Sequence, residues 1–184
     1  MSGFPDPLAL DRQALQHALD GLSRHLAERG IKAHIYVVGG AAMVLAHRSA
    51  RLTRDVDALA IDRREEVLEA AAMVADEQGL SPDWLNGAVR TAPRPDARAA
   101  VVYDSRNLVV TGASAEQLLA MKVRAGRAAD SEDLKLLIRR LGISTLLHVQ
   151  AIHGAVFPHD TIPERNMELI MDCLQRVRDA RASD

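Results

Sequence analysis

The sequence predicts an α+β protein, with a mixed β-sheet flanked by helices and a helical C-terminal part. Two observations support this fold class. Runs rich in β-branched residues alternate with helical patterns up to about residue 112, and only helical patterns follow. We therefore expect a core over residues 1–112 that holds the sheet and the functional site, and a helical part over residues 113–184 packed on that core.

The first predicted elements are a helix, a strand and a second helix. Apolar residues at helical spacing predict an amphipathic helix over 11–29. The β-branched run over 34–38 predicts a buried strand, which Gly39 and Gly40 end sharply. A short helix is then expected over 41–47.

The rest of the sheet is expected after residue 54. A strand is predicted over 55–61, and Asp62 with Glu65 three residues later predicts the capped start of a helix that ends at Gly79. Prolines and glycines between 81 and 96 predict a loop or a poorly formed sheet edge. Two further strands are expected over 99–103 and 108–111.

The helical part begins with a clear capping pattern. Ser114 and Gln117 predict a capping box for a helix that runs to about Ala125. Asp130 begins the next predicted helix, which stops at Gly142. Two more helices are expected over 144–153 and 164–181.

Composition restricts the class of protein. Hydrophobic residues make up 48% and charged residues 26%, as in a folded globular chain, and the net charge of -2 argues against a general polyanion binder. Aromatic residues are only 3%, so we do not expect binding of single strands by base stacking. The single Cys173 and the lack of a signal pattern over residues 1–7 or a long apolar run predict a cytoplasmic protein without a membrane segment.

Two carboxylates form the strongest candidate for chemistry. Asp55 and Asp57 are two residues apart on a predicted strand, so their side chains should emerge on the same face. Paired carboxylates can bind the hard divalent cations on which phosphoryl transfer depends. The turn at Gly39 and Gly40 is complementary, because backbone N–H groups before a helix can approach the phosphates of an NTP closely.

These motifs resemble those of the DNA polymerase beta-like nucleotidyltransferase superfamily, and in particular its minimal bacterial members, which include toxins of toxin-antitoxin and abortive-infection pairs. The first matching text is Val37-Val38-Gly39-Gly40-Ala41-Ala42, followed by Arg51-Leu52-Thr53-Arg54-Asp55-Val56-Asp57. A second block, Leu118-Leu119-Ala120-Met121-Lys122 with Arg127, Asp130 and Asp133, resembles the lysine-and-acid segment of that group.

The resemblance implies an enzyme that transfers a nucleotidyl group from an NTP to an acceptor hydroxyl with Mg²⁺ or Mn²⁺. It implies metal ligands at Asp55 and Asp57, with Asp104 as the candidate third carboxylate. It also implies nucleotide contacts from Gly39, Gly40, Thr53, Arg54, Lys122 and Arg127. The second glycine is often serine in the superfamily, so Gly40 removes a hydroxyl contact.

The acceptor and several roles stay open at this point. Arginines before the carboxylates and near Lys122 favour an RNA acceptor, such as a tRNA 3′ end, over a protein or a small molecule; they are Arg48, Arg51, Arg54, Arg124 and Arg127. A cognate antitoxin is an expected partner of a toxin. The alternatives are that Asp130 simply caps a helix with Asp133 in its first turn, that Lys122 and Arg127 belong to a solvated face, and that the whole chain is a non-catalytic nucleotide-binding or protein-interaction module.

Overall fold

Five strands form a mixed sheet flanked by helices, and a helical C-terminal part follows, so the protein is α+β as predicted. The computed structural model describes residues 9–60, 62–87 and 93–183. It divides into two compact units, Met1–Ala113 and Ser114–Asp184. The elements of the first unit, in chain order, are α1 (Arg12–Glu28), β1 (Ala33–Val37), α2 (Gly39–His47), β2 (Val56–Ala60), α3 (Arg64–Gln78), β3 (Leu85–Asn86), β4 (Ala100–Asp104) and β5 (Leu108–Gly112).

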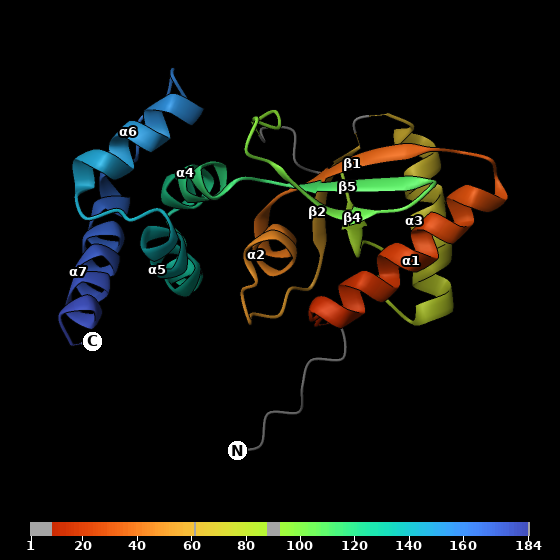
Figure 1. Ribbon diagram of the computed structural model, residues 1–184, viewed down its shortest axis with the longest axis horizontal. Coiled ribbons are helices and arrows are strands. Elements are labelled where there is room, and N and C mark those ends of the chain that lie inside the picture. Colours follow the sequence, from red (N-terminus) through yellow and green to blue (C-terminus); the bar gives the residue numbers. More distant parts are fainter. Residues whose placement is uncertain (1–8, 61, 88–92, 184) are drawn as a thin grey trace, which may run out of the picture. The chain divides into compact units, whose positions relative to one another are not determined.

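The strand order is β3-β2-β1-β5-β4 (Figure 1). β1 runs parallel to β5 and antiparallel to β2, β4 runs antiparallel to β5, and β3 runs parallel to β2. In this register Val37 lies opposite both Ala58 and Gly112. The C-terminal ends of β1 and β5 therefore meet the N-terminal ends of β2 and β4, at what we name the Gly39 end of the sheet.

Helix α1 forms where the apolar periodicity predicts it. Its N-terminus is capped by the Asp11 carboxylate, which accepts a hydrogen bond from the Ala14 N–H at 2.8 Å. Its apolar stripe is completely buried, and α1 packs along α3 (Figure 1). The stripe consists of Leu15, Ala18, Leu19, Leu22 and Leu26.

The start of α3 differs from the prediction. Asp62 does not cap this helix, because its carboxylate accepts a hydrogen bond from the His34 N–H of β1 at 2.9 Å. Arg63 stands at the cap position instead, with a left-handed backbone (φ 56°) and an ion pair to Glu66. The expected cap at Asp62 is therefore wrong, because its side chain accepts a hydrogen bond from β1 and not from the first turn of α3. Ile61, the expected end of the preceding strand, lies outside the described residues.

The second unit consists of helices. These are α4 (Ala115–Ala125), η1 (Ala128–Asp130), α5 (Ser131–Arg140), α6 (Leu146–Val156), η2 (Glu164–Asn166) and α7 (Met167–Ser183). The predicted start of α4 is confirmed, since the Ser114 hydroxyl accepts a hydrogen bond from the Gln117 N–H at 3.2 Å. At the other end of α4, the Asn166 amide donates to the carbonyls of Val123 and Arg124, each at 2.9 Å. Within the described ranges, no helix combines the length and the apolar character that crossing a bilayer requires.

Candidate functional site

The step from β1 to α2 lies at the Gly39 end of the sheet. Gly39 has a left-handed backbone (φ 61°), a conformation that glycine adopts without steric penalty. The preceding Val38 donates its N–H to the carbonyl of Asp57 at 2.9 Å, which ties this step to β2. Val38 provides no side-chain cap for α2. The first N–H groups of α2 thus form the positive end of a helix dipole beside the two strands.

The Asp57 carboxylate lies directly against Gly39. A Cβ atom added at Gly39 would stand 3.0 Å from Oδ2 of Asp57, so any side chain there would crowd the carboxylate. Asp57 is half-buried in β2, whereas Asp55 is exposed. We expected both on one strand, but β2 begins at Val56, where pairing with β3 begins, and Asp55 lies one residue before it.

Thr53 fills the space beside the second glycine. A Cβ atom at Gly40 would stand only 2.6 Å from the Thr53 hydroxyl oxygen. That hydroxyl donates to the Asp55 carbonyl at 3.0 Å, and the Thr53 backbone pairs with Leu10. The Arg51 guanidinium carbon lies 3.7 Å from the same Cβ position. Any side chain at position 40 would therefore have to displace the Thr53 side chain.

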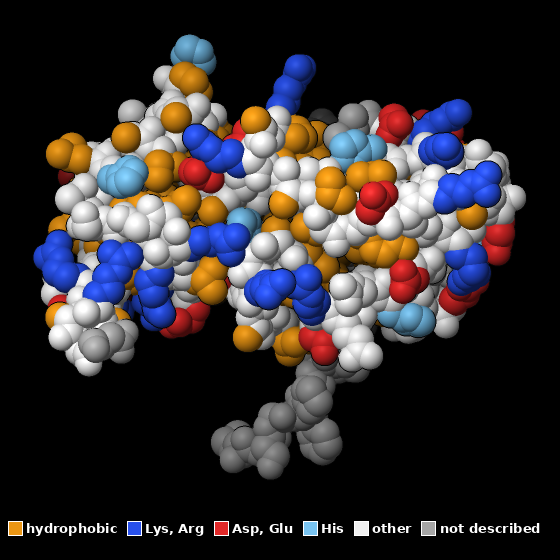
Figure 2. All heavy atoms as spheres, viewed as in Figure 1, with side chains coloured by type: hydrophobic (Ala, Val, Ile, Leu, Met, Phe, Trp, Pro, Cys, Tyr) orange, Lys and Arg blue, Asp and Glu red, His pale blue; other side chains and the backbone are white. Residues whose placement is uncertain are grey.

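Arginines line open depressions around Ser49, between the start of α1 and the end of α2. One depression, of about 350 Å³, is lined by Arg12, Ser49 and Arg51 among others, and a second, of about 330 Å³, by Arg12, Arg48 and Ser49. Lys and Arg side chains gather over α2 in Figure 2. We name Arg12, Arg48 and Arg51 the arginine surface. Its charge favours contact with a polyanion.

Two members of the arginine surface are fixed by the end of α2. Arg12 donates to the carbonyls of Val44 and Leu45, both at 3.2 Å, in the last turn of that helix. Arg48 ends α2 with a left-handed backbone (φ 55°). A cation beside the last turn of a helix also complements its dipole. Arg54, which we expected at the same site, is exposed and does not line these depressions.

Asp104 does not join the other two carboxylates. It is the last residue of β4 and lies opposite Val109, whereas Ala100 at the other end of β4 lies opposite Gly112. Because a strand rises about 3.3 Å per residue, Asp104 lies about 10 Å along the sheet from the Gly39 end. The expectation that Asp104 is the third carboxylate is corrected, since the antiparallel direction of β4 carries it away.

Asn86 lies where no site residue was expected. The stretch 81–96 was predicted as a loop or a poorly formed edge, and its residues 88–92 lie outside the described ones. Its described part contains β3, the edge strand, in which Asn86 lies opposite Asp57. Sequence reasoning missed Asn86 because a two-residue strand leaves no periodic pattern. The apolar Trp84-Leu85 pair before it was the only available signal.

Lys122 is buried among carboxylates in the second unit. Its ammonium lies 2.6 Å from Asp130 Oδ1 and 2.8 Å from Asp133 Oδ2, and its side chain is only 8% exposed. Asp130 is the N-cap residue of α5 and Asp133 lies in its first turn, as the capping alternative expected, but the Asp130 carboxylate makes no cap hydrogen bond. The solvated-face alternative is wrong for Lys122, because its side chain is buried. The acids of the second matching block bind its own lysine and join α4 to the start of α5.

The two arginines expected near Lys122, Arg124 and Arg127, have different surroundings. Arg124 forms an ion pair with Asp160 and lies over the ring of Phe157, with its guanidinium carbon 4.9 Å from the ring centre. Arg127 is exposed, between α4 and η1. Of these two, Arg127 is thus the better placed to meet a ligand from solution.

The donor atoms at the Gly39 end suit a hard divalent cation. Asp55 and Asp57 supply carboxylate oxygens, and glycine at position 39 keeps the space beside Asp57 clear. In the described part of the chain, no three His, Cys, Asp or Glu side chains are grouped as a metal site. The two carboxylates would therefore need other oxygen ligands, such as amide, phosphate or water oxygens, to complete an octahedron.

The fold and this site define a class of protein. A five-stranded mixed sheet with helices, in which a glycine step and an aspartate meet at one end, is consistent with the nucleotidyltransferase fold. Residues 14–153 match the model of a family described as "Nucleotidyltransferase of unknown function (DUF6036)", and the chain belongs to this family. Comparison with curated proteins gave no match, and neither did comparison with solved structures.

Proposed function

We propose that this protein transfers a nucleotidyl group from an NTP to an acceptor hydroxyl, with Mg²⁺ or Mn²⁺ bound by Asp55 and Asp57. One observation carries the proposal: the Asp57 carboxylate lies against the left-handed Gly39 at the N-terminus of α2. A negative group for metal and a positive helix end for phosphate thus adjoin each other. The family's description supports the same activity.

Each residue of the site has a proposed task. The backbone N–H groups at Gly39 and Gly40 bind phosphate oxygens of the NTP, because neither residue carries a side chain that would keep the phosphates away. Thr53 holds the segment before Asp55 through its hydroxyl. When bound, a divalent cation supplies charge stabilisation at the transferring phosphoryl group. The acceptor oxygen attacks the α-phosphorus, and pyrophosphate leaves.

Outside these residues, the triphosphate contacts are proposed from the arginines. Arg54 is retained as a candidate for NTP contact, and the exposed Arg127 of the second unit as a candidate for contact with a ligand from solution. We leave Lys122 out, because two carboxylates already neutralise its ammonium in a buried setting. The expectation that Lys122 binds the triphosphate is thus replaced by a structural role for the Lys122, Asp130 and Asp133 cluster.

We further propose that the acceptor is RNA, with a tRNA 3′ end as the first candidate. The support is the arginine surface, which places positive charge beside Gly40 in a chain with net charge -2. A role as the toxin of a toxin-antitoxin pair, with an antitoxin protein as partner, extends this proposal. A cytoplasmic setting accords with the single buried thiol of Cys173.

The decisive experiment uses α-labelled NTPs, Mg²⁺ and total RNA with the full chain. The expected result is label on RNA that requires Mg²⁺ and the Asp57 carboxylate. Label on a protein or a small molecule would remove the RNA acceptor and leave nucleotidyl transfer standing. Binding of NTP without transfer to any acceptor would instead support the non-catalytic nucleotide-binding module.

A further inference from the structure

β3 brings one more oxygen donor next to Asp57. It runs parallel to β2, with Leu85 opposite Val56 and Asn86 opposite Asp57. Residues paired across strands carry their side chains on the same face of the sheet. Asp57 and Asn86 are therefore separated by about one strand spacing. Val56 and Leu85 are both buried, while Asp57 and Asn86 are both half-buried, as expected for opposite faces. An amide and a carboxylate therefore lie side by side at the Gly39 end.

The position of Asn86 is fixed from the neighbouring helix. Trp84 is 0% exposed, and its indole N–H donates to the Ala71 carbonyl of α3 at 2.9 Å. The Trp84 carbonyl in turn accepts a hydrogen bond from the Val56 N–H at 2.6 Å. Sliding β3 along β2 would require moving a buried indole. The pairing of Asn86 with Asp57 is therefore held by the core and not by the short strand alone.

We propose that Asn86 supplies, through its Oδ1 atom, the third protein ligand of the divalent cation bound by Asp55 and Asp57. This inference rests on the proposed function. Amide carbonyl oxygens are ordinary ligands of hard cations. In the described part of the chain no third acid is grouped with the pair, and Asp104 lies at the other end of its strand.

A neutral third ligand changes the properties of the site. Two carboxylates and one amide give the site two negative charges, where three carboxylates would give three. Cation affinity follows the ligand charge count, so the protein alone should bind the cation weakly and should depend on triphosphate oxygens to complete the site. An amide also cannot accept a proton, which leaves Asp55, Asp57 or solvent to receive the proton of the acceptor hydroxyl.

The test measures Mn²⁺ binding directly, from the electron paramagnetic resonance signal of free Mn²⁺, without turnover. Asn86→Ala is expected to raise the Kd for Mn²⁺ by about tenfold, the lower end of the effect of losing a group that supports a metal site. Asn86→Asp, which is nearly identical in shape and adds a charge, is expected to lower that Kd. Asp104→Asn is the matched control at the other end of the sheet and should leave it unchanged.

The outcomes separate this inference from the proposed function. If Asn86→Asp and Asn86→Ala both bind Mn²⁺ as the wild type does, while Asp57→Ala loses binding, Asn86 is not a ligand and the carboxylate site stands. If Asp57→Ala also binds Mn²⁺ normally, the proposed metal site is itself wrong. Thermal unfolding of each variant identifies any that is not folded. If Asn86→Ala does not fold, the Mn²⁺ affinity of Asn86→Asp still decides the test.

Discussion

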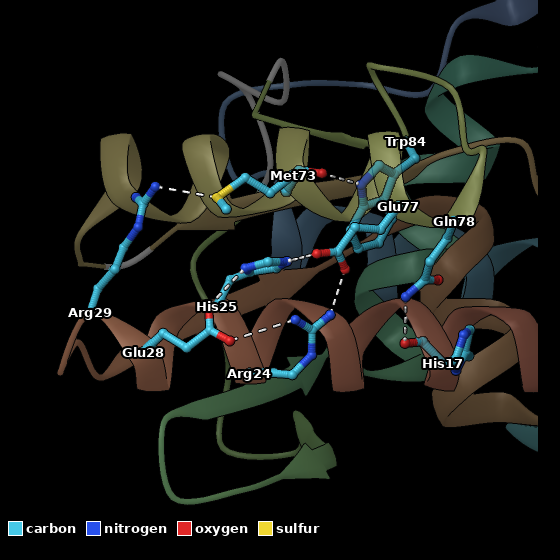
Figure 3. Close-up of polar contacts among 10 residues, drawn as sticks. His17, Arg24, His25, Glu28, Arg29, Met73, Glu77, Gln78 and Trp84 are labelled. Atoms are coloured by element: carbon cyan, nitrogen blue, oxygen red, sulfur yellow. Dashed lines mark hydrogen bonds and ion pairs between the residues drawn. The ribbon is translucent and has the colours of Figure 1, made fainter.

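The imidazole of His25 lies between two carboxylates, with Nε2 3.0 Å from Oε1 of Glu77, so that a buried side chain of α1 is joined to α3 (Figure 3). Glu28 lies 3.3 Å from the other ring nitrogen, and Arg24 contacts both acids. His25 is 3% exposed, whereas its partners reach the surface. This cluster fastens the two helices by charge as well as by apolar packing.

The Glu77 carboxylate should make stability depend on acidity. Its pKa is lowered, first by the hydrogen bond from Arg24 and also by His25. A lowered pKa in the fold contributes stability that is present above the carboxyl's ordinary pKa and is lost as the pH falls through the folded value. Urea unfolding at about pH 7 and at about pH 4 should therefore show a smaller acid-induced loss of stability for Glu77→Gln than for the wild type. Glu69→Gln, at an exposed ion pair with Arg29, is the control, and an equal change in both variants would contradict the prediction.

The Asp57 carboxylate should be required for transfer and dispensable for folding. Asp57→Ala and Asp55→Ala should each lower kcat by about a hundredfold or more, since metal-held charge stabilisation is worth several kcal/mol. The thermal unfolding midpoint should change little. Asp104→Asn should keep transfer activity, because Asp104 lies at the other end of β4. Near wild-type activity in Asp57→Ala would reject the site.

Lys122 should matter for stability more than for NTP use. Lys122→Met leaves two carboxylates without their cation, and breaking a buried pair in this way costs about 3–5 kcal/mol. Adding Asp130→Asn and Asp133→Asn should restore most of this loss, because no uncompensated charge then remains. Denaturant unfolding measures both effects. Lys135→Met, at an ion pair with the largely exposed Glu132, is the control and should cost less than about 1 kcal/mol. A raised KM for NTP with unchanged stability would instead support the expectation that Lys122 contacts the triphosphate.

Gly40 and Thr53 should be coupled in a double-mutant cycle. Gly40→Ala forces a methyl group to within 2.6 Å of the Thr53 hydroxyl, so it should destabilise the protein by about 1–3 kcal/mol. Thr53→Ala removes that hydroxyl, and the double variant should be more stable than the sum of the two single changes predicts. Gly154→Ala is the control, because nothing lies near its Cβ position in α6, and it should stabilise by about 0.5–1 kcal/mol. Strict additivity at positions 40 and 53 would contradict the contact.

The arginine surface should determine how binding of RNA depends on salt. Arg48→Ala and Arg51→Ala should each reduce the slope of log Kd against log salt by about 1, because each removes one phosphate contact. Fluorescence anisotropy with labelled tRNA and no NTP measures the slope. Arg106→Ala is the control, since Arg106 is exposed in the turn between β4 and β5, away from the Gly39 end. Equal slopes in all variants would show that the arginine surface does not bind RNA, and they would not bear on the proposed NTP site.

The sequence predicted the elements whose signals are local. The apolar spacing of α1, the β-branched run before Gly39 and the Ser114 cap of α4 are each visible within a short stretch of sequence, although α1 and β1 are buried by distant elements. β3 was predicted only as a loop or a poorly formed edge, because its position depends on the contact of Trp84 with Ala71 of α3, which no local pattern shows. Local capping rules also failed at Asp62, where the competing donor was the distant His34.

The candidate site was predictable only in part. The proximity of Asp57 to the glycine step follows from a hairpin-like order of strand, helix and strand, which the motif itself contains. Placing Asp104 correctly requires the direction of β4, and placing Asn86 requires the register of β3. No local sequence pattern indicates either of these. Lys122 was predicted as a nucleotide contact from the resemblance of the second block to the superfamily. The two acids that form ion pairs with it, Asp130 and Asp133, belong to the same block.

The contact between Gly40 and Thr53 also has an evolutionary consequence. A single mutation from glycine to serine at position 40 would be selected against while threonine stands at position 53, because one hydroxyl occupies the volume that the new side chain needs. A lineage could pass between the two glycine-turn types only by first losing the threonine hydroxyl. Among relatives of this chain, the residues at positions 40 and 53 should therefore covary, with serine at the first accompanied by alanine or glycine at the second.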